Sequence, residues 1–244
     1  MSRKQREIAE RHKLFLRISR NVIETEGYAS LSMDRIAEQA EYSKGTVYQH
    51  FSCKEEVLIQ LCNNDAATLK ELMDRAALYQ GSTRERVLAF FVAYDIWSRL
   101  NPVYQDLVRT LYSSSTLEKV SEDSRLCNQQ LHLSIIDTVA RVVREAADVG
   151  DITVSLGISP NEIVFGLWSL VYGGQQLLST ALPFSELGID DPEHALLRTC
   201  EVALDGHGWQ PLSKDYDSQT LIESIQQAIF ADEIGELAGR KAAI

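Results

Sequence analysis

The stretch from Ser32 to Lys54 limits the possible folds more than any other part of this sequence. Between Met33 and Ala40, apolar residues recur at the i, i+3, i+4 and i+7 positions that form one face of an α-helix. Ser32 precedes this face, where its hydroxyl can accept a hydrogen bond from a free amide of the first turn. The sequence therefore predicts a short amphipathic helix that begins after Ser32.

A second short helix is predicted from Lys44 to His50, after an interruption of the apolar pattern at residues 41–43. Ser43 stands before it as a second N-cap candidate. A helix this short is not stable alone, so it must pack against its neighbours. Two such helices joined by a three-residue turn form a helix-turn-helix, whose second helix enters the DNA major groove. A third helix is predicted to begin at Lys54.

The stretch IAEQAEYSKGTVYQHFSCKEEVL resembles the N-terminal domain of the TetR family of one-component transcriptional regulators, and the close match covers residues 8–60. The matching positions are Ile36, Ala37, Ala40, Ser43, Gly45, Tyr48, His50, Phe51, Lys54 and Leu58. Glu41 departs from the family pattern, because it stands where the family usually has glycine. That position calls for a left-handed backbone, which glycine adopts freely. The turn is therefore expected to be strained or altered at Glu41.

The resemblance implies a ligand-responsive, sequence-specific DNA-binding regulator. Its simplest form is a repressor that a small, mostly apolar effector releases from a palindromic DNA operator. The residues expected to contact DNA are Ser32, Ser43, Lys44, Gly45, Thr46, Tyr48, Gln49, His50 and Lys54. By resemblance, Tyr48 and His50 donate to phosphate and Lys54 binds it. Thr46 and Lys44 are expected to read bases, because lysine donates to guanine and the threonine methyl touches the thymine methyl.

Two other classes of function are alternatives. A helical adaptor could keep this fold and bind a protein partner, with the two short helices used only for packing. An enzyme is the other alternative, although the sequence has no glycine-rich phosphate loop, no paired histidines at helical spacing and no nucleophile elbow. We therefore predict no catalytic residues, no bound metal and no cofactor.

The charge distribution is compatible with DNA binding. The net charge of the whole chain is −11, yet residues 1–20 carry seven basic side chains against two acidic ones. Charges more than about 8 Å apart are heavily screened at physiological salt. A basic N-terminal face can therefore contact phosphates while the acidic remainder aids solubility. The alternative is that residues 1–20 form only a solvated tail.

The compartment is predicted to be the cytoplasm. No apolar run approaches the ~20 residues that cross a bilayer, and the charged N-terminus is unlike a signal peptide. The four cysteines lack the spacing of a metal site, so we expect reduced thiols. No membrane partner is expected.

We predict an all-α protein in three parts. Residues 1–53 form an N-terminal three-helix helix-turn-helix domain, and residues 54–206 a larger ligand-binding and dimerisation domain, joined by a connecting helix over 54–77. Residues 207–244 form a C-terminal extension with one extra helix. Residues 207–217 read as a linker, and the tail from Gly239 is expected to be mobile. A long helix over 115–149 is expected to be kinked or split near Ser121–Ser124.

The resemblance also implies an effector pocket within the larger domain, where aromatic residues are frequent. Aromatic walls with a few polar groups suit a mostly apolar ligand. The residues expected to line it are Phe91, Tyr94, Trp97, Tyr104, Arg109, Tyr112, His132, Trp168 and Tyr172. Arg109 is the expected partner of an anionic end of the ligand. The alternative is that the aromatic residues simply fill the core, and that His132 is a packed or surface residue.

A homodimer interface is implied on the helices predicted over 159–182 and 192–206. The residues expected there are Val164, Leu167, Val171, Leu178, Leu196, Leu197, Cys200 and Leu204. The pair Gly173-Gly174 is costly inside a helix. Close approach of another helix or of a ligand would explain this pair, and a local kink is the alternative.

Overall fold

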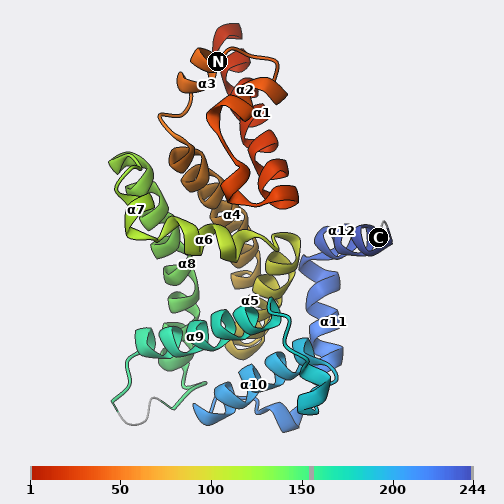
Figure 1. Ribbon diagram of the computed structural model, residues 1–244. Coiled ribbons are helices and arrows are strands. Elements are labelled where there is room, and N and C mark those ends of the chain that lie inside the picture. The colour runs from red at the N-terminus through yellow and green to blue at the C-terminus, as the bar shows by residue number, and fades with distance from the viewer. Residues whose placement is uncertain (1, 154–156, 243–244) are drawn as a thin grey trace. The chain divides into compact units, whose positions relative to one another are not determined.

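The computed structural model describes residues 2–153 and 157–242, and in this part of the chain all regular structure is helical (Figure 1). The predicted all-α fold is therefore confirmed. The helices are α1 (Arg3–Glu26), α2 (Met33–Gln39), α3 (Lys44–Tyr48), α4 (Lys54–Ala77), α5 (Thr83–Leu100), α6 (Tyr104–Leu111), α7 (Ser114–Leu117), α8 (Glu122–Val149), α9 (Pro160–Leu178), α10 (Pro192–Gly206), α11 (Ser218–Ile229) and α12 (Ala231–Ala242). Short 3-10 turns are η1 (Tyr28–Ser30), η2 (Phe184–Leu187) and η3 (Ser213–Asp215).

Several helix starts follow directly from local sequence. The Ser82 hydroxyl accepts from the backbone N–H of Glu85, whose carboxylate accepts the N–H of Ser82 in return. Ser159 and Glu162 form the same capping box at the start of α9. Such reciprocal caps satisfy amides that have no partner within the helix. The expected split of the long helix near Ser121 is also confirmed, because α7 ends before it and α8 begins after it.

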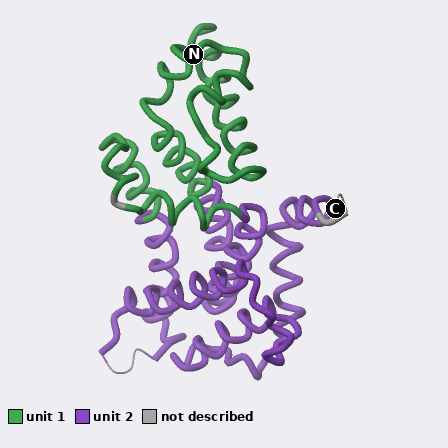
Figure 2. Tube along the Cα trace, viewed as in Figure 1, with its two compact units in different colours: residues 1–67, 103–132 green, residues 68–102, 133–244 purple. Residues whose placement is uncertain are grey.

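The chain forms two compact units (Figure 2). Unit 1 consists of residues 1–67 and 103–132, and unit 2 of residues 68–102 and 133–244. The helices α4 and α8 each contribute to both units. The division differs from the predicted boundaries, because residues 103–132 group with the N-terminal helices and not with the larger helical body.

The core of unit 1 lies between α1, α2, α3 and the first half of α4. Phe15, Ile36, Val47 and Leu58 are all fully buried there. The rings of Phe15 and Phe51 meet edge to face at 6.5 Å. This apolar centre explains how the five-residue α3 is held, because a helix of that length depends on tertiary packing.

The core of unit 2 is built around α5. From Val87 to Trp97 nearly every side chain of α5 is buried, as expected for a helix surrounded by others. On its flanks, α9 packs against α10 at Gly174, where an added Cβ would lie 2.4 Å from Cδ1 of Leu196. Close approach of a helix of the same chain therefore explains Gly174, whereas a Cβ on Gly173 would meet nothing within 4 Å.

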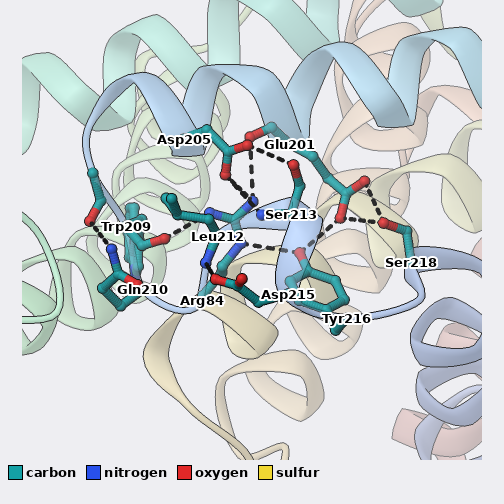
Figure 3. A network of polar contacts seen from close by, with 11 residues as sticks. Arg84, Glu201, Asp205, Trp209, Gln210, Leu212, Ser213, Asp215, Tyr216 and Ser218 are labelled. Atoms are coloured by element: carbon teal, nitrogen blue, oxygen red, sulfur yellow. Dashed lines mark hydrogen bonds and ion pairs between the residues drawn. The ribbon is translucent and has the colours of Figure 1, made fainter.

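The predicted linker over residues 207–217 is wrong, because side chains of this segment make fixed contacts with α5 and α10 of unit 2 (Figure 3). Trp209 is fully buried, and its ring N–H donates to the Thr83 hydroxyl at 2.9 Å. The guanidinium of Arg84, also fully buried, donates to the Trp209 carbonyl oxygen at 2.7 Å and to the Tyr216 hydroxyl at 3.0 Å. The segment joins α10 to α11 through fixed contacts.

The C-terminal extension contains two helices where the sequence predicted one. After α11 the chain continues as α12, which includes Gly239, so the expectation of a mobile tail from that residue is wrong. Phe230 between the two helices is fully buried, with the Arg75 guanidinium 5.3 Å from its ring centre. Arg75 also pairs with Glu233 on α12. Residues 243 and 244 lie outside the described part of the chain.

Candidate nucleic-acid interface

The two short helices predicted around residues 33–50 form as α2 and α3. The Ser32 hydroxyl accepts from the N–H of Arg35, and the Ser43 hydroxyl accepts from the N–H of Thr46 at 3.1 Å. In the turn between them, Glu41 has φ of 57°, the left-handed conformation expected for this position. A side chain other than glycine, asparagine or aspartate in this conformation costs about 1–2 kcal/mol. The turn therefore keeps the required geometry at the expense of local strain.

The exposed edge of α3 carries most of the predicted DNA-contacting side chains. Ser43, Lys44, Gly45, Tyr48 and Gln49 are exposed, and the Tyr48 side chain retains 46% of its accessible surface. Val47, on the opposite side of α3, is fully buried. One face of α3 thus packs against the domain, and the opposite face is exposed to solvent. The backbone amides of its first turn that have no helical partner favour a bound anion.

Besides the capping serines, three predicted contact residues are engaged within the protein. The Lys44 ammonium lies 2.6 Å from a carboxylate oxygen of Asp34, and this hydrogen bond raises the pKa of Lys44. The Lys54 ammonium lies 4.7 Å from the centre of the Tyr28 ring. The Thr46 hydroxyl is 2.8 Å from that of Ser43. Base or phosphate contacts by these side chains must therefore replace or share existing ones.

His50 lies against α1, beside a histidine that was not singled out in the sequence. Its ring is 5.6 Å from that of His12, which stacks on Phe51 at 4.7 Å. Burial lowers the pKa of both histidines, and the nearby charges of His12 and Arg11 lower that of His50 further. Both imidazoles are therefore neutral at pH 7, so His50 can donate a hydrogen bond to phosphate without carrying a charge. The sequence feature that could have pointed to His12 is its position next to the basic residue Lys13.

The N-terminal half of α1 extends the positive surface of unit 1. Arg3, Lys4, Arg6 and Lys13 are exposed on it. A hollow between α1 and the end of α3 is lined by Gln5, Ile8, Ala9, His12, Lys13 and His50. Residues 3–20 are therefore not a solvated tail, because they belong to α1, which begins with a capping box between Ser2 and Gln5 and buries Phe15 and Leu16.

The predicted effector-pocket residues are separated by burial into two groups. Phe91, Tyr94, Trp97 and Tyr104 are buried, and the rings of Tyr94 and Trp97 are 5.6 Å apart. Arg109, Tyr112, Trp168 and Tyr172 are exposed instead, with Trp168 retaining 46% of its surface and the Arg109 guanidinium paired with Asp106. These four side chains lie at the surface of the single chain, and their part in an effector site stays a prediction.

His132 takes part in a polar network inside unit 1. Its Nδ1 lies 2.8 Å from the carbonyl oxygen of Asn128, which can only accept, so Nδ1 carries the proton. Nε2 is then free to accept from the Tyr104 hydroxyl at 3.4 Å. The Asn128 side chain accepts from Tyr112 at 2.8 Å and donates to Asn63 at 2.7 Å. His132 is therefore a packed residue with defined partners.

The predicted dimer residues largely face the interior of their own chain. Val164, Leu167, Val171, Cys200 and Leu204 are all buried without any partner subunit. Leu178, Leu196 and Leu197 are half-buried, and Leu196 packs on Gly174. These residues therefore contribute to the core of unit 2, and their part in a dimer interface stays a prediction. The outward face of α9 instead carries Phe165, Trp168 and Tyr172, which are exposed to 65%, 46% and 36%.

Within residues 2–153 and 157–242, no three histidine, cysteine or acidic side chains are grouped so that they could hold a metal ion. Over the same residues, no helix combines the length and apolar composition needed to cross a membrane.

These features define an all-helical protein with an N-terminal helix-turn-helix. A family model described as "Bacterial regulatory proteins, tetR family" matches residues 15–61, which contain most of α1, all of α2 and α3 and the start of α4. The sequence match to the TetR family therefore covers the N-terminal helix-turn-helix region of the chain. No curated protein sequence matches the chain.

Solved structures share the fold over most of the chain. A regulatory protein of the tetR family from Rhodococcus RHA1 is 18% identical with a TM-score of 0.62, covering 82% of this chain and 97% of that one. The fatty acid degradation regulator FadR from Bacillus halodurans is 15% identical with a TM-score of 0.60, covering 82% and 97%. A SmeT–triclosan complex is 18% identical with a TM-score of 0.55, covering 81% and 91%.

Proposed function

We propose that this protein is a homodimeric repressor that binds a palindromic operator through α3 and releases it when a small, mostly apolar effector binds. The observation that carries the proposal is the geometry of α2 and α3. Two serine-capped helices flank a turn with a left-handed residue. The buried Val47 anchors α3 in the core, and the polar edge of α3 faces solvent. This is the arrangement in which a recognition helix enters the major groove.

We propose that some residues of α3 position the helix on DNA and that others read the base sequence. Tyr48 and the neutral His50 donate to phosphate, which fixes the register of the helix on DNA without reading sequence. Thr46 and Lys44 reach base edges, and loss of one good base contact costs about 1–3 kcal/mol of discrimination. Lys44 exchanges its Asp34 partner for a base when DNA binds.

The exposed arginines and lysines of α1 are proposed to contribute the salt-dependent part of the affinity. Each phosphate contact releases counterions, so log K falls with log salt with a slope of about −0.9 per contact. This local positive surface compensates for the net charge of −11, because residues 1–60 carry a net charge of +1 and residues 61–244 carry −12.

Dimerisation is proposed through the outward faces of α9 and α10. Phe165, Trp168 and Tyr172 form an exposed aromatic row on α9, with the rings of Trp168 and Tyr172 6.3 Å apart. On α10, Val202 is exposed to 66%. Aromatic side chains of this kind are enriched at protein interfaces. A dimer would bring two copies of α3 to half-sites one DNA turn, about 34 Å, apart.

The effector is proposed to be a small, mostly apolar organic molecule. Two observations support this class. The α5 helix supplies buried aromatic rings at Phe91, Tyr94 and Trp97, and one structural neighbour is a complex with triclosan. Arg109, which is exposed and pairs with Asp106, stays the predicted partner of an anionic end of the ligand.

Selection of binding sites from a random pool of DNA duplexes tests the DNA-binding proposal. The full chain should enrich a palindrome with two half-sites about one turn apart. Tyr48→Phe should weaken binding to all duplexes but enrich the same sequence, whereas Thr46→Ala should change one position of it. Recovery of duplexes without any common sequence would contradict sequence-specific binding.

A further inference from the structure

The first turn of α4, directly after the helix-turn-helix, holds two buried carboxylates. Glu55 and Glu56 retain only 8% and 6% of their accessible surface. Buried carboxylates are rare unless hydrogen bonds or ion pairs satisfy them. Their partners lie not in the α1–α3 domain but on the segment that joins α7 to α8, and all of these residues belong to unit 1.

Glu56 completes the N-terminal cap of α8, a helix in a different part of the chain. Ser121 precedes α8, and its hydroxyl accepts from the N–H of Ser124, the third residue of the helix. In a capping box, a Glu at this third position would accept the N–H of the capping serine. Ser124 has no carboxylate to do so. Glu56 takes that place, because one of its oxygens accepts the Ser121 N–H at 3.0 Å.

The other oxygen of Glu56 binds hydroxyl groups of the same helix start. It accepts from the Ser121 hydroxyl at 3.1 Å and from the Ser124 hydroxyl. Beside it, the Lys119 ammonium lies 3.0 Å from Glu55. Burial raises the pKa of Glu56, but the hydrogen bonds from Ser124 and Ser121 outweigh it and leave the pKa below its usual value. The carboxylate is therefore charged at neutral pH, as an α8 N-terminus favours.

A second contact lies two turns further along α4. The side-chain amide of Asn128 on α8 donates to Asn63 at 2.7 Å, and the Asn63 amide donates to the Ser124 carbonyl at 3.5 Å. Tyr112, at the end of α6, donates to the same Asn128 side chain. The first half of α4 is thus attached to the start of α8 at two levels, and through Asn128 to α6.

We propose that Glu56 is a positioning residue that couples the segment of residues 103–132 to the DNA-binding helices. The contacts of Glu56 with Ser121 and Ser124 are called the α4–α8 cap below. The inference rests on the proposed DNA-binding function. Lys54, a predicted phosphate ligand, is two residues from Glu56 on the same helical turn. A change that strengthens the binding of α4 to DNA therefore also stabilises the start of α8. By linkage, a change that stabilises the start of α8 strengthens DNA binding by the same free energy.

Hydrogen exchange of the full chain, with and without a duplex of the DNA upstream of its own gene, tests the coupling. In the wild type, saturating DNA should slow exchange of the backbone amides of residues 121–130 by at least severalfold. In Glu56→Ala the DNA-induced slowing should be lost, and in Glu56→Gln, which keeps the acceptor oxygen, it should be partly restored. A purely structural role of Glu56 would lower stability but leave the DNA-induced slowing intact.

The matched control is Glu162→Ala. Glu162 caps α9 by the same chemistry, with its carboxylate 2.7 Å from the Ser159 N–H, but it lies in unit 2. This variant should retain the slowing at residues 121–130. Slowing retained in Glu56→Ala, or no slowing in a wild type that binds DNA, would overturn the proposed coupling.

Exchange without DNA separates a failure of the coupling from a failure of the proposed function. If the wild type binds no duplex, the DNA-binding proposal fails, and the coupling is judged on the free protein alone. There, Glu56→Ala should speed exchange both in residues 121–130 and in α2 and α3, while Ser124→Ala should give the same pattern more weakly. Faster exchange confined to residues 121–130 in both variants would overturn the coupling.

Discussion

Substitution of Arg84 by methionine tests whether the C-terminal extension is a fixed part of unit 2. Arg84 has no accessible surface, and its guanidinium donates to the carbonyl oxygens of Trp209 and Glu201 at 2.7 and 3.3 Å and to the Tyr216 hydroxyl (Figure 3). It also pairs with Asp205 at 2.8 Å. Methionine keeps much of the apolar stem but removes every donor.

The expected loss follows from the groups left without a donor. Trp209 and Glu201 are buried, so each orphaned carbonyl costs about 1–3 kcal/mol. Asp205 is partly exposed and keeps its hydrogen bond from the Ser213 N–H at 3.0 Å, so its share is small. We therefore expect Arg84→Met to lower the free energy of unfolding by about 3–5 kcal/mol, the range for breaking a buried ion pair.

Two measurements test this expected loss of stability. At about 2–4 °C per kcal/mol, the melting temperature should fall by roughly 6–20 °C. Hydrogen exchange should show that the amides of residues 209–218 lose their protection before those of α5. The control is Arg141→Met on α8, because Arg141 and its partner Asp137 are both exposed and the loss of this pair should cost less than about 1 kcal/mol. An Arg84→Met protein as stable as the control, with residues 209–218 still protected, would refute the reasoning.

Three further predictions concern the turn, the dimer and the α4–α8 cap. Glu41→Gly should raise the free energy of unfolding in urea by up to about 1 kcal/mol, because glycine adopts the φ of 57° without strain; an unchanged or lower stability would argue against strain. Trp168→Glu should give soluble monomers in light scattering, since it places a charge on the aromatic row of α9; an intact dimer would move the interface elsewhere. Glu56 has a lowered pKa, so the stability difference between wild type and Glu56→Gln should be full above pH 4.5 and disappear as the pH falls through that lowered pKa; a difference that persists at pH 2 would exclude the charged carboxylate as its source.

Local sequence was sufficient wherever a helix start depends on its own residues. The capping boxes at Ser82 and Ser159 and the N-caps at Ser32 and Ser43 involve partners within three residues, so the pattern contains the whole interaction. The left-handed backbone at Glu41 was inferred in the same way, from a family position that requires it.

Long-range partners were not predictable from the pattern. Residues 207–217 have the glycine, proline and polar content of a linker, yet Arg84, more than a hundred residues earlier, fixes them. Likewise, the apolar positions of α9 showed that Leu167 needs to be buried but not that other segments of the same chain bury it. The role of Glu56 as a cap for α8 was invisible for the same reason, because its partners lie 65 to 68 residues away.

The central claim, sequence-specific DNA binding through α3, is tested most directly by fluorescence anisotropy with two labelled duplexes. One carries the DNA upstream of the protein's own gene, and the other has the same composition in shuffled order. The account predicts that the wild type binds the upstream duplex at least 10³-fold more tightly, the lower end of the range for specific over non-specific affinity. It also predicts that Thr46→Ala lowers this ratio, whereas Tyr48→Phe weakens binding to both duplexes alike. Equal affinity of the wild type for the two duplexes, or a ratio that Thr46→Ala and Lys44→Ala leave unchanged, would contradict it.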